Sequence, residues 1–173
     1  VNGCKAMDSV EVVQNTTPPA VDAGLSDTLN CLNNSLIING SASGQGALVF
    51  LWTASTGHIT QGYNSLSPTV DMPGSYTLMV TDQVNGCSAL DSVSVFQDAN
   101  IPVADAGQND TLNCLVNQTT LLATASTGPG YQYLWTTNGG NIVSDPAVLQ
   151  AVVNAPGMYR LAVTNVANGC ARQ

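Results

Sequence analysis

An internal repeat of 83 residues constrains the fold of this chain more than any other feature. The phrase DAGLSDTLNC at 22–31 returns as DAGQNDTLNC at 105–114, so the two cysteines stand 83 positions apart (114 − 31). A second phrase keeps the same interval, with VNGC at 1–4, VNGC at 84–87 and ANGC at 167–170. A chain that repeats in register is usually built from one structural unit used several times.

The repeat divides the chain into three parts. We expect residues 15–98 and 99–173 to form two domains of the same kind, and residues 1–14 to be the closing strand of a preceding repeat. The second repeat lacks most of its last strand, because ANGCARQ extends only a few residues into the phrase. We therefore expect a window of a longer array that continues past Gln173, rather than subunits that complete one another by donating residues 1–13.

Composition limits the partners of such an array. Charged residues make up 8% of the chain, with Lys+Arg 3 against Asp+Glu 11 and a net charge of -8. This excludes nucleic acid and anionic membrane surfaces, because both are bound through clustered Lys and Arg. No apolar run approaches the roughly 20 residues of a membrane helix, so no membrane insertion is expected. Hydrophobic residues still reach 44% and lie in short bounded runs, which excludes disorder.

Short apolar runs separated by turn residues predict an all-β sandwich. In the first repeat these runs are TLNCL (28–32), SLIING (35–40), ALVFLWTA (47–54), SPTVDM (67–72), SYTLMVTD (75–82) and ALDSVSVFQ (89–97). No window long enough for a helix carries an apolar stripe of helical period. Trp52 and Trp135 fall in matching strands, in the runs FLWT and YLWT, so we expect both indoles in the core.

Several motifs together resemble a known kind of repeat. DAG near the start, GSAS at 40–43, Leu-Trp-Thr at 51–53, the run P-G-x-Y-x-L-x-V-T-D at 73–82 and D-S-V-S-V at 91–95 are similar to PKD-like and bacterial immunoglobulin-like repeats. Those repeats are modules of large cell-surface adhesins and secreted proteins. The likeness covers essentially all of 18–170, and it implies tandem immunoglobulin-like sandwiches outside the cell. Tyr76 and Tyr159 match the structural tyrosine corner of such folds.

The cysteines predict disulfides and hence an oxidising, extracellular setting. Two regular pairings fit the spacing: Cys31–Cys87 with Cys114–Cys170 inside repeats, or Cys4–Cys31 with Cys87–Cys114 across them. From Cys87 the closing strand runs roughly 11 residues, at about 3.3 Å each, away from that end of the domain. In immunoglobulin-like sandwiches the strand containing TLNC lies beside the closing strand. We therefore expect one disulfide within each domain, with Cys4 bonded upstream.

Acidic residues near the domain junctions are candidates for calcium, which prefers oxygen ligands. They are Asp22, Asp27, Asp98, Asp105 and Asp110. No D-x-D-x-D run occurs, and acidic residues in turns are ordinarily solvated. We therefore expect no cofactor, and calcium is only a weak candidate. Zinc is a poorer candidate, since there is no CxxC and the single His58 has no counterpart in the second repeat. One unrepeated histidine is also a poor base for catalysis, and we expect no enzyme.

Four Asp-Ser/Thr-aliphatic tripeptides stand at equivalent positions of the repeats. Their hydroxyl residues are Ser9, Thr28, Ser92 and Thr111. The pattern is similar to the O-glycosylation signal that one large group of Gram-negative bacteria uses on exported proteins. Alternation of polar and apolar residues along a strand explains the same pattern without a sugar, and both explanations stay open at this point.

The expected function is mechanical. The chain would be a stiff, disulfide-stapled stalk segment of a long extracellular adhesin or surface filament. The linkers NTTPPA (15–20) and ANIPVA (99–104) are short and carry proline, which favours semi-rigid neighbours. Expected partners are other copies or neighbouring repeats in a filament, and a cell-surface receptor or glycan reached through another part of the chain. The alternative is a glycan- or protein-binding immunoglobulin-like module of a secreted protein.

Overall fold

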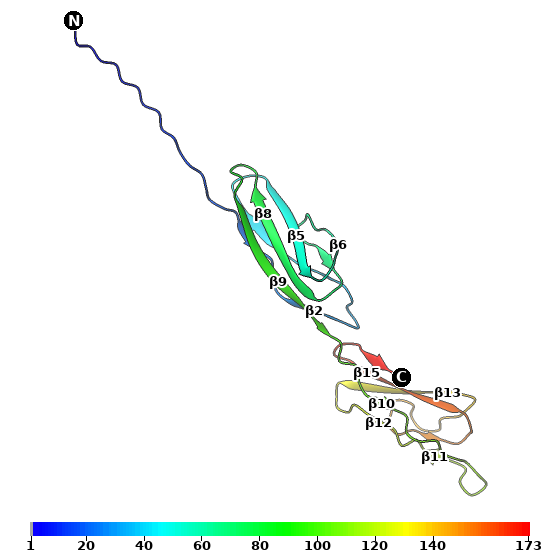
Figure 1. Ribbon diagram of the computed structural model, residues 1–173. Helices are drawn as coiled ribbons and strands as arrows, with labels where there is room; N and C mark the ends of the chain where they lie inside the picture. The colour runs from blue at the N-terminus through cyan, green and yellow to red at the C-terminus, as the bar shows by residue number, and fades with distance from the viewer. Residues whose placement is uncertain (1) are drawn as a thin grey trace. The chain divides into compact units, whose positions relative to one another are not determined.

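A computed structural model describes residues 2–173. All the regular secondary structure in this range is β-strand (Figure 1). The strands are β1 (Ala20–Asp22), β2 (Asp27–Asn30), β3 (Leu36–Ile37), β4 (Ser41–Ser43), β5 (Leu48–Thr56), β6 (Ile59–Gln61), β7 (Thr69–Val70), β8 (Gly74–Asp82), β9 (Ser88–Asp98), β10 (Ala104–Asp105), β11 (Thr119–Thr120), β12 (Thr124–Ala125), β13 (Tyr131–Asn138), β14 (Val152–Val153), β15 (Met158–Asn165) and β16 (Ala171–Arg172). The all-β class expected from the sequence is confirmed. No helix in this part of the chain is long and apolar enough to cross a membrane. Val1, the first residue of the expected closing strand 1–14, lies outside the described residues.

The chain folds into two compact units. Unit 1 consists of residues 2–26, 37–70 and 74–94, and unit 2 consists of residues 27–36, 71–73 and 95–173. The units differ from the sequence repeats chiefly in residues 27–36, which carry the first TLNCL phrase and pack in unit 2. Residues 2–19 form no strand and are exposed almost throughout.

The first repeat forms an immunoglobulin-like β-sandwich. One sheet has the strand order β2-β9-β8-β5, a second has the order β3-β7-β6, and β1 pairs with β4. In β8 the side chains of Tyr76, Leu78 and Val80 are fully buried while their neighbours are not, as alternation predicts. A Cβ on Gly74 would lie 1.8 Å from the Thr56 carbonyl oxygen, so only glycine lets β8 begin this close to β5.

Both tryptophans are core residues. Trp52 and Trp135 are each 2% exposed, which confirms the expectation from the sequence. The Trp52 Nε1 donates a hydrogen bond to the Ser65 carbonyl at 2.9 Å, and the Trp135 Nε1 donates to the Leu149 carbonyl at 3.2 Å. Each indole therefore contributes its apolar area to the core with its polar group satisfied.

The two tyrosine corners are formed as expected. The Tyr76 hydroxyl accepts the His58 N–H at 3.1 Å. The Tyr159 hydroxyl accepts the Asn141 N–H at 2.9 Å and donates to the Ala155 carbonyl at 2.6 Å. In both repeats the phenol thus fixes a loop 18 residues upstream of the strand that carries it.

The second repeat forms a less complete sandwich. Its sheets have the orders β13-β15-β16, β11-β14 and β10-β12. Its core contains Ala123, Trp135, Ala151, Leu161 and Val163. The phrase at 110–113 matches β2 in sequence but forms no strand, and only β16 represents the closing strand.

Candidate functional site: a disulfide-bonded turn and loop

Cys31 is held by a tight turn at the end of β2. Its position follows from the parallel pairing of β2 with β9, in which Asn30 is in register with Asp98, the last residue of β9. The Asn30 Oδ1 then accepts the N–H groups of Leu32 at 2.9 Å and of Asn33 at 2.8 Å. The Asn30 N–H donates to the Asn33 carbonyl at 2.9 Å. We call these four residues, Asn30 to Asn33, the cysteine turn.

Cys170 lies in a loop that Asn168 organises. The Asn168 Oδ1 accepts the Cys170 N–H at 3.0 Å, and its Nδ2 donates to the Asp98 carboxylate at 2.9 Å and to the Asn100 carbonyl at 3.2 Å. Asn168 is itself 1% exposed, so its amide is a fully satisfied buried group. Gly169 has a φ of 70°, a left-handed conformation that favours glycine. We call Asn168 to Cys170 the glycine loop.

Asp98 ties the glycine loop to the end of β9. The N–H of Asn100, followed by the side-chain amide of Asn168, holds the pKa of the Asp98 carboxyl below its usual range. The carboxylate accepts both bonds through its Oδ1.

The cysteine turn and the glycine loop are in direct contact within unit 2. Cys31 and Cys170 form a disulfide with their Cα atoms 5.0 Å apart and a sequence separation of 139. The Leu32 N–H donates to the Asn168 carbonyl at 3.2 Å. A Cβ on Gly169 would lie 2.3 Å from Leu32 Cγ, so the loop needs glycine for room as well as for its backbone conformation.

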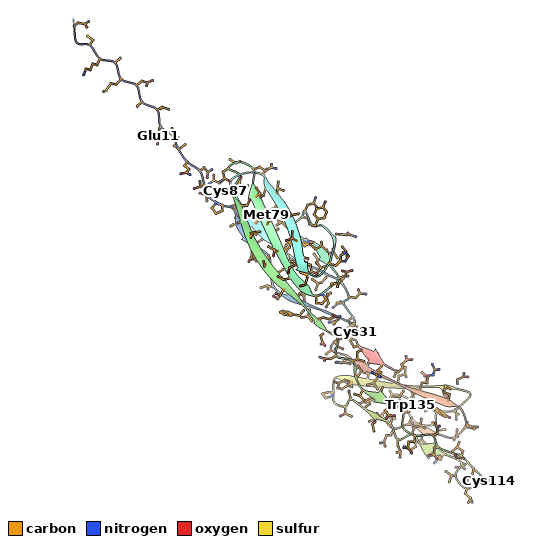
Figure 2. The ribbon with its side chains drawn as sticks, in the orientation of Figure 1. Glu11, Cys31, Met79, Cys87, Cys114 and Trp135 are labelled. Carbon is orange, nitrogen blue, oxygen red and sulfur yellow. A yellow bond between two sulfur atoms is a disulfide. The ribbon has the colours of Figure 1, made fainter. Side chains whose placement is uncertain are left out.

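This bond shows that the predicted pairing of Cys31–Cys87 and Cys114–Cys170 is wrong. The TLNC strand does lie beside the closing strand, but it runs parallel to it and meets its far end. The 11 residues of β9 begin just after Cys87 and span about 36 Å. A disulfide needs Cα atoms within about 4.4–6.8 Å. Figure 2 shows Cys87 and Cys31 at the two ends of β9.

Cys4, Cys87 and Cys114 are free thiols. Cys4 and Cys114 are exposed, and Cys87 is half-buried. The upstream bond expected for Cys4 stays a prediction.

The four candidate O-glycosylation residues lie at exposed or half-buried positions. Ser9, Thr28 and Thr111 share a local arrangement in which the preceding aspartate accepts the residue's own N–H, at 2.8, 2.7 and 2.7 Å. The Ser92 hydroxyl lies 2.8 Å from the Thr77 hydroxyl. Exposure agrees with both explanations of the tripeptide pattern, a sugar signal and strand alternation.

The aspartates considered for calcium are each bonded to a nearby backbone group. Asp22, Asp27, Asp98, Asp105 and Asp110 each accept the N–H of a residue one or two positions further on, at 2.7–3.0 Å. The Thr119 hydroxyl, followed by the Thr111 N–H, lowers the pKa of Asp110. Among residues 2–173 no three His, Cys, Asp or Glu side chains are placed to hold one metal ion. The structure therefore does not bring these aspartates together.

Sequence reasoning missed a cavity of about 620 Å³ in unit 2. Residues 110–112 line one side of it and Met158 and Tyr159, at the start of β15, line another. In the first sandwich β9 lies between β2 and β8, the counterparts of these two segments. In the second repeat the cavity lies between the two equivalent segments. Among the described residues, the segment 110–113 pairs with no strand.

Comparison with known proteins finds only distant structural similarity. No protein-family model matches the chain, and no curated protein matches it. Among solved structures, the I-band fragment I67–I69 of titin is 14% identical with a TM-score of 0.42, and the match covers 91% of this chain and 64% of the fragment. The Ig1-2 module of the Drosophila receptor tyrosine phosphatase DLAR is 9% identical with a TM-score of 0.35, and the match covers 90% of this chain and 94% of the module. This chain thus spans less than two thirds of the titin fragment.

Proposed function

We propose that this chain is a non-catalytic structural segment of an extracellular tandem array, such as an adhesin stalk or a surface filament. The observation that supports this most is the Cys31–Cys170 disulfide, which joins one 83-residue repeat to the next. Disulfides persist in oxidising compartments, which favours a location outside the cell. The low content of charged residues and the acidic balance agree with a surface that does not bind nucleic acid.

The disulfide changes the route that tension takes through the chain. A pull on the two ends passes along residues 1–31, across the bond, and along residues 170–173. Residues 32–169 lie outside this covalent path and cannot be extended while the bond is intact. A segment of this kind limits its own extension under load, which is the property that a stalk requires.

Single-molecule pulling of the full chain, held at its two ends, tests this function. The oxidised chain is expected to reach a contour length of about 120 Å, and the reduced chain about 600 Å, at roughly 3.5 Å per residue. The variant Cys87→Ser is the matched control, because it removes a cysteine that is not in the bond and should leave both lengths unchanged. An oxidised chain that extends as far as the reduced one would overturn the proposal.

O-glycosylation of Ser9, Thr28, Ser92 and Thr111 is part of the same proposal. Its support is the equivalent placing of the four tripeptides in the repeats and the solvent access of all four residues. Intact-mass measurement on material from the native source decides the matter. A mass equal to that of the bare polypeptide rules the modification out.

A further inference from the structure

The loop that carries Cys87 is built like the glycine loop that carries Cys170. The Asn85 Oδ1 accepts the Cys87 N–H at 2.9 Å, and its Nδ2 donates to the Thr17 carbonyl at 2.8 Å and to the Asn15 side chain at 3.2 Å. The partners of Asn85 (Cys87, Thr17 and Asn15) lie 83 residues before the partners of Asn168 (Cys170, Asn100 and Asp98). The loop glycine, Gly86, has a φ of 73°, against 70° in the glycine loop. The first repeat therefore holds a second glycine loop, formed by residues 85–87.

This second glycine loop has nothing packed against its glycine. A Cβ on Gly86 would meet no atom within 4 Å, whereas the same atom on Gly169 would meet Leu32. Cys87 is a half-buried free thiol, whereas Cys170 is 1% exposed and bonded. The loop thus keeps its conformation without the turn that covers its counterpart.

The turn that carries Cys114 is likewise a second copy of the cysteine turn. The Asn113 Oδ1 accepts the N–H groups of Leu115 at 2.8 Å and of Val116 at 2.9 Å, and the Asn113 N–H donates to the Val116 carbonyl at 2.8 Å. Leu115, the counterpart of Leu32, is 95% exposed. This turn is formed with its cysteine and its leucine both uncovered.

We propose that Cys87 and Cys114 are the open halves of two further disulfides of the Cys31–Cys170 kind. Cys87 forms a disulfide with the cysteine of a TLNCL turn from another repeat of this 83-residue class. Cys114 forms a disulfide with the cysteine of an NGC loop from another such repeat. The equivalent cysteines, Cys170 one period after Cys87 and Cys31 one period before Cys114, are already bonded to each other in this structure. The rule is that each cysteine turn bonds to the glycine loop of the repeat that follows it.

The chemistry is ordinary thiol–disulfide exchange. A thiolate attacks a small-molecule disulfide, such as oxidised glutathione, and the second cysteine displaces the remaining glutathione thiolate. The two protein thiols lose two protons and two electrons, and the glutathione disulfide is reduced to two thiols. The inference goes beyond the proposed function, because this pattern of bonds would hold whatever load or ligand the array carries.

A three-repeat chain tests the rule. It is the full chain with a second copy of residues 16–98 inserted between Asp98 and Ala99, which keeps the register. In the inserted copy the exposed residues Ser35 and Leu90 become Thr and Met, so that its cysteine peptides have distinct masses. The chain is oxidised with glutathione, alkylated and mapped without reduction. We expect Cys31 bonded to the inserted copy of Cys87, and the inserted copy of Cys31 bonded to Cys170.

Two outcomes would overturn the proposal: a bond between the two inserted cysteines, or the inserted copy of Cys87 left free for alkylation. A matched pair of variants tests the contact itself. Gly86→Asn in the inserted copy keeps a left-handed backbone accessible but places a Cβ where Leu32 must pack. The yield of the disulfide between Cys31 and the inserted copy of Cys87 should therefore fall at least about tenfold. The same change at the first Gly86, whose loop has no turn against it, should leave the yield unchanged. Equal effects of the two changes would also count against the proposal.

A second measurement does not depend on the folding of the three-repeat chain. The parent chain is incubated in glutathione buffer with a synthetic peptide of residues 105–118, which carries Cys114 in its turn sequence. We expect the peptide to form a mixed disulfide with Cys87 in preference to Cys4, which lies in the exposed segment 2–19. Equal or lower labelling of Cys87 would contradict the proposal.

Discussion

Asp82 and Asn165 occupy equivalent positions of the two repeats, but Asp82 carries an ionisable carboxyl group and Asn165 a neutral amide. Asp82 is buried at the end of β8, where its carboxylate accepts the N–H groups of Val84 at 2.8 Å and of Gln45 at 2.9 Å. The Val84 N–H holds the pKa of Asp82 below its ordinary value; burial opposes this and the Gln45 N–H adds to it. One ionised side chain therefore joins two loops of unit 1.

We expect this carboxylate to make unit 1 sensitive to acid. A group whose pKa is depressed by folding stabilises the folded state above its unfolded pKa, which is 3.8, and that stability is lost as the pH falls through the folded pKa. The Tm of unit 1 should therefore fall as the pH drops below about 4. Asp82→Asn should lower the Tm at neutral pH and flatten the acid dependence. Thermal unfolding followed by Trp52 fluorescence in a Trp135→Phe background measures both.

The matched control for acid sensitivity is Glu11→Gln, in the exposed segment 2–19. It should leave the curve of Tm against pH unchanged. An Asp82→Asn chain that loses Tm with acid as steeply as the parent would show that another carboxyl is responsible.

Gly169 tests the contact between the glycine loop and the cysteine turn. Gly169→Ala should cost about 1–2 kcal/mol for the left-handed backbone and more for the overlap with Leu32. Gly139→Ala is the control, since Gly139 has a φ of 79° but open space around it, and only the backbone cost applies. Urea unfolding followed by Trp135 fluorescence in a Trp52→Phe background gives the two losses. Equal losses would mean that the contact adds nothing.

At the scale of strands, length decided what the sequence could predict. The long runs at β5, β8 and β9 carry enough alternation to be recognised, and the structure confirms them. The strands β1, β4 and β6 are three residues each, too short for any period to show. The burial of Trp52 and Trp135 could be predicted because each follows an aromatic-Leu pair at the same place in a long strand.

The direction of pairing could not be predicted, and it decides the disulfide. A four-residue strand such as β2 has the same alternation whether it pairs parallel or antiparallel. A bond from TLNC of one repeat to NGC of the next spans 139 residues, but it recurs with the same 83-residue period as the two pairings considered from the sequence. Only the parallel register, with Asn30 opposite Asp98, places Cys31 at the correct end of β9.

The cavity in unit 2 predicts the effect of a closing strand. A chain extended after Gln173 by residues 91–98 in register should fill the cavity with the counterparts of the buried residues Val93 and Val95. Residues 110–113 should then pair as a strand, and their amide exchange should slow by at least about tenfold. Hydrogen exchange read by NMR measures this. An extension with both valines changed to serine is the control, and equal protection from it would contradict the apolar fit.

At the scale of the whole molecule, the disulfide closes a loop with a sequence separation of 139. Closing a loop of this size lowers the entropy of the unfolded chain, which corresponds to about 5 kcal/mol of stability. Cys31→Ser should therefore lower the free energy of unfolding of unit 2 by up to that amount. Calorimetry of the oxidised proteins measures the change. Cys114→Ser, at the equivalent free cysteine, should have no effect, and a similar loss from it would refute this account.

The bond also gives the chain a second connection across the linker between its repeats. A protease that cuts once anywhere from Leu32 to Gly169 opens a ring rather than releasing a fragment. Limited digestion at residues 99–103, which belong to no strand, should therefore give one band on a non-reducing gel and two bands after reduction. Two bands without reduction would contradict this. A single backbone break between Leu32 and Gly169 therefore leaves the chain in one piece, and only a second cut or a reductant parts it.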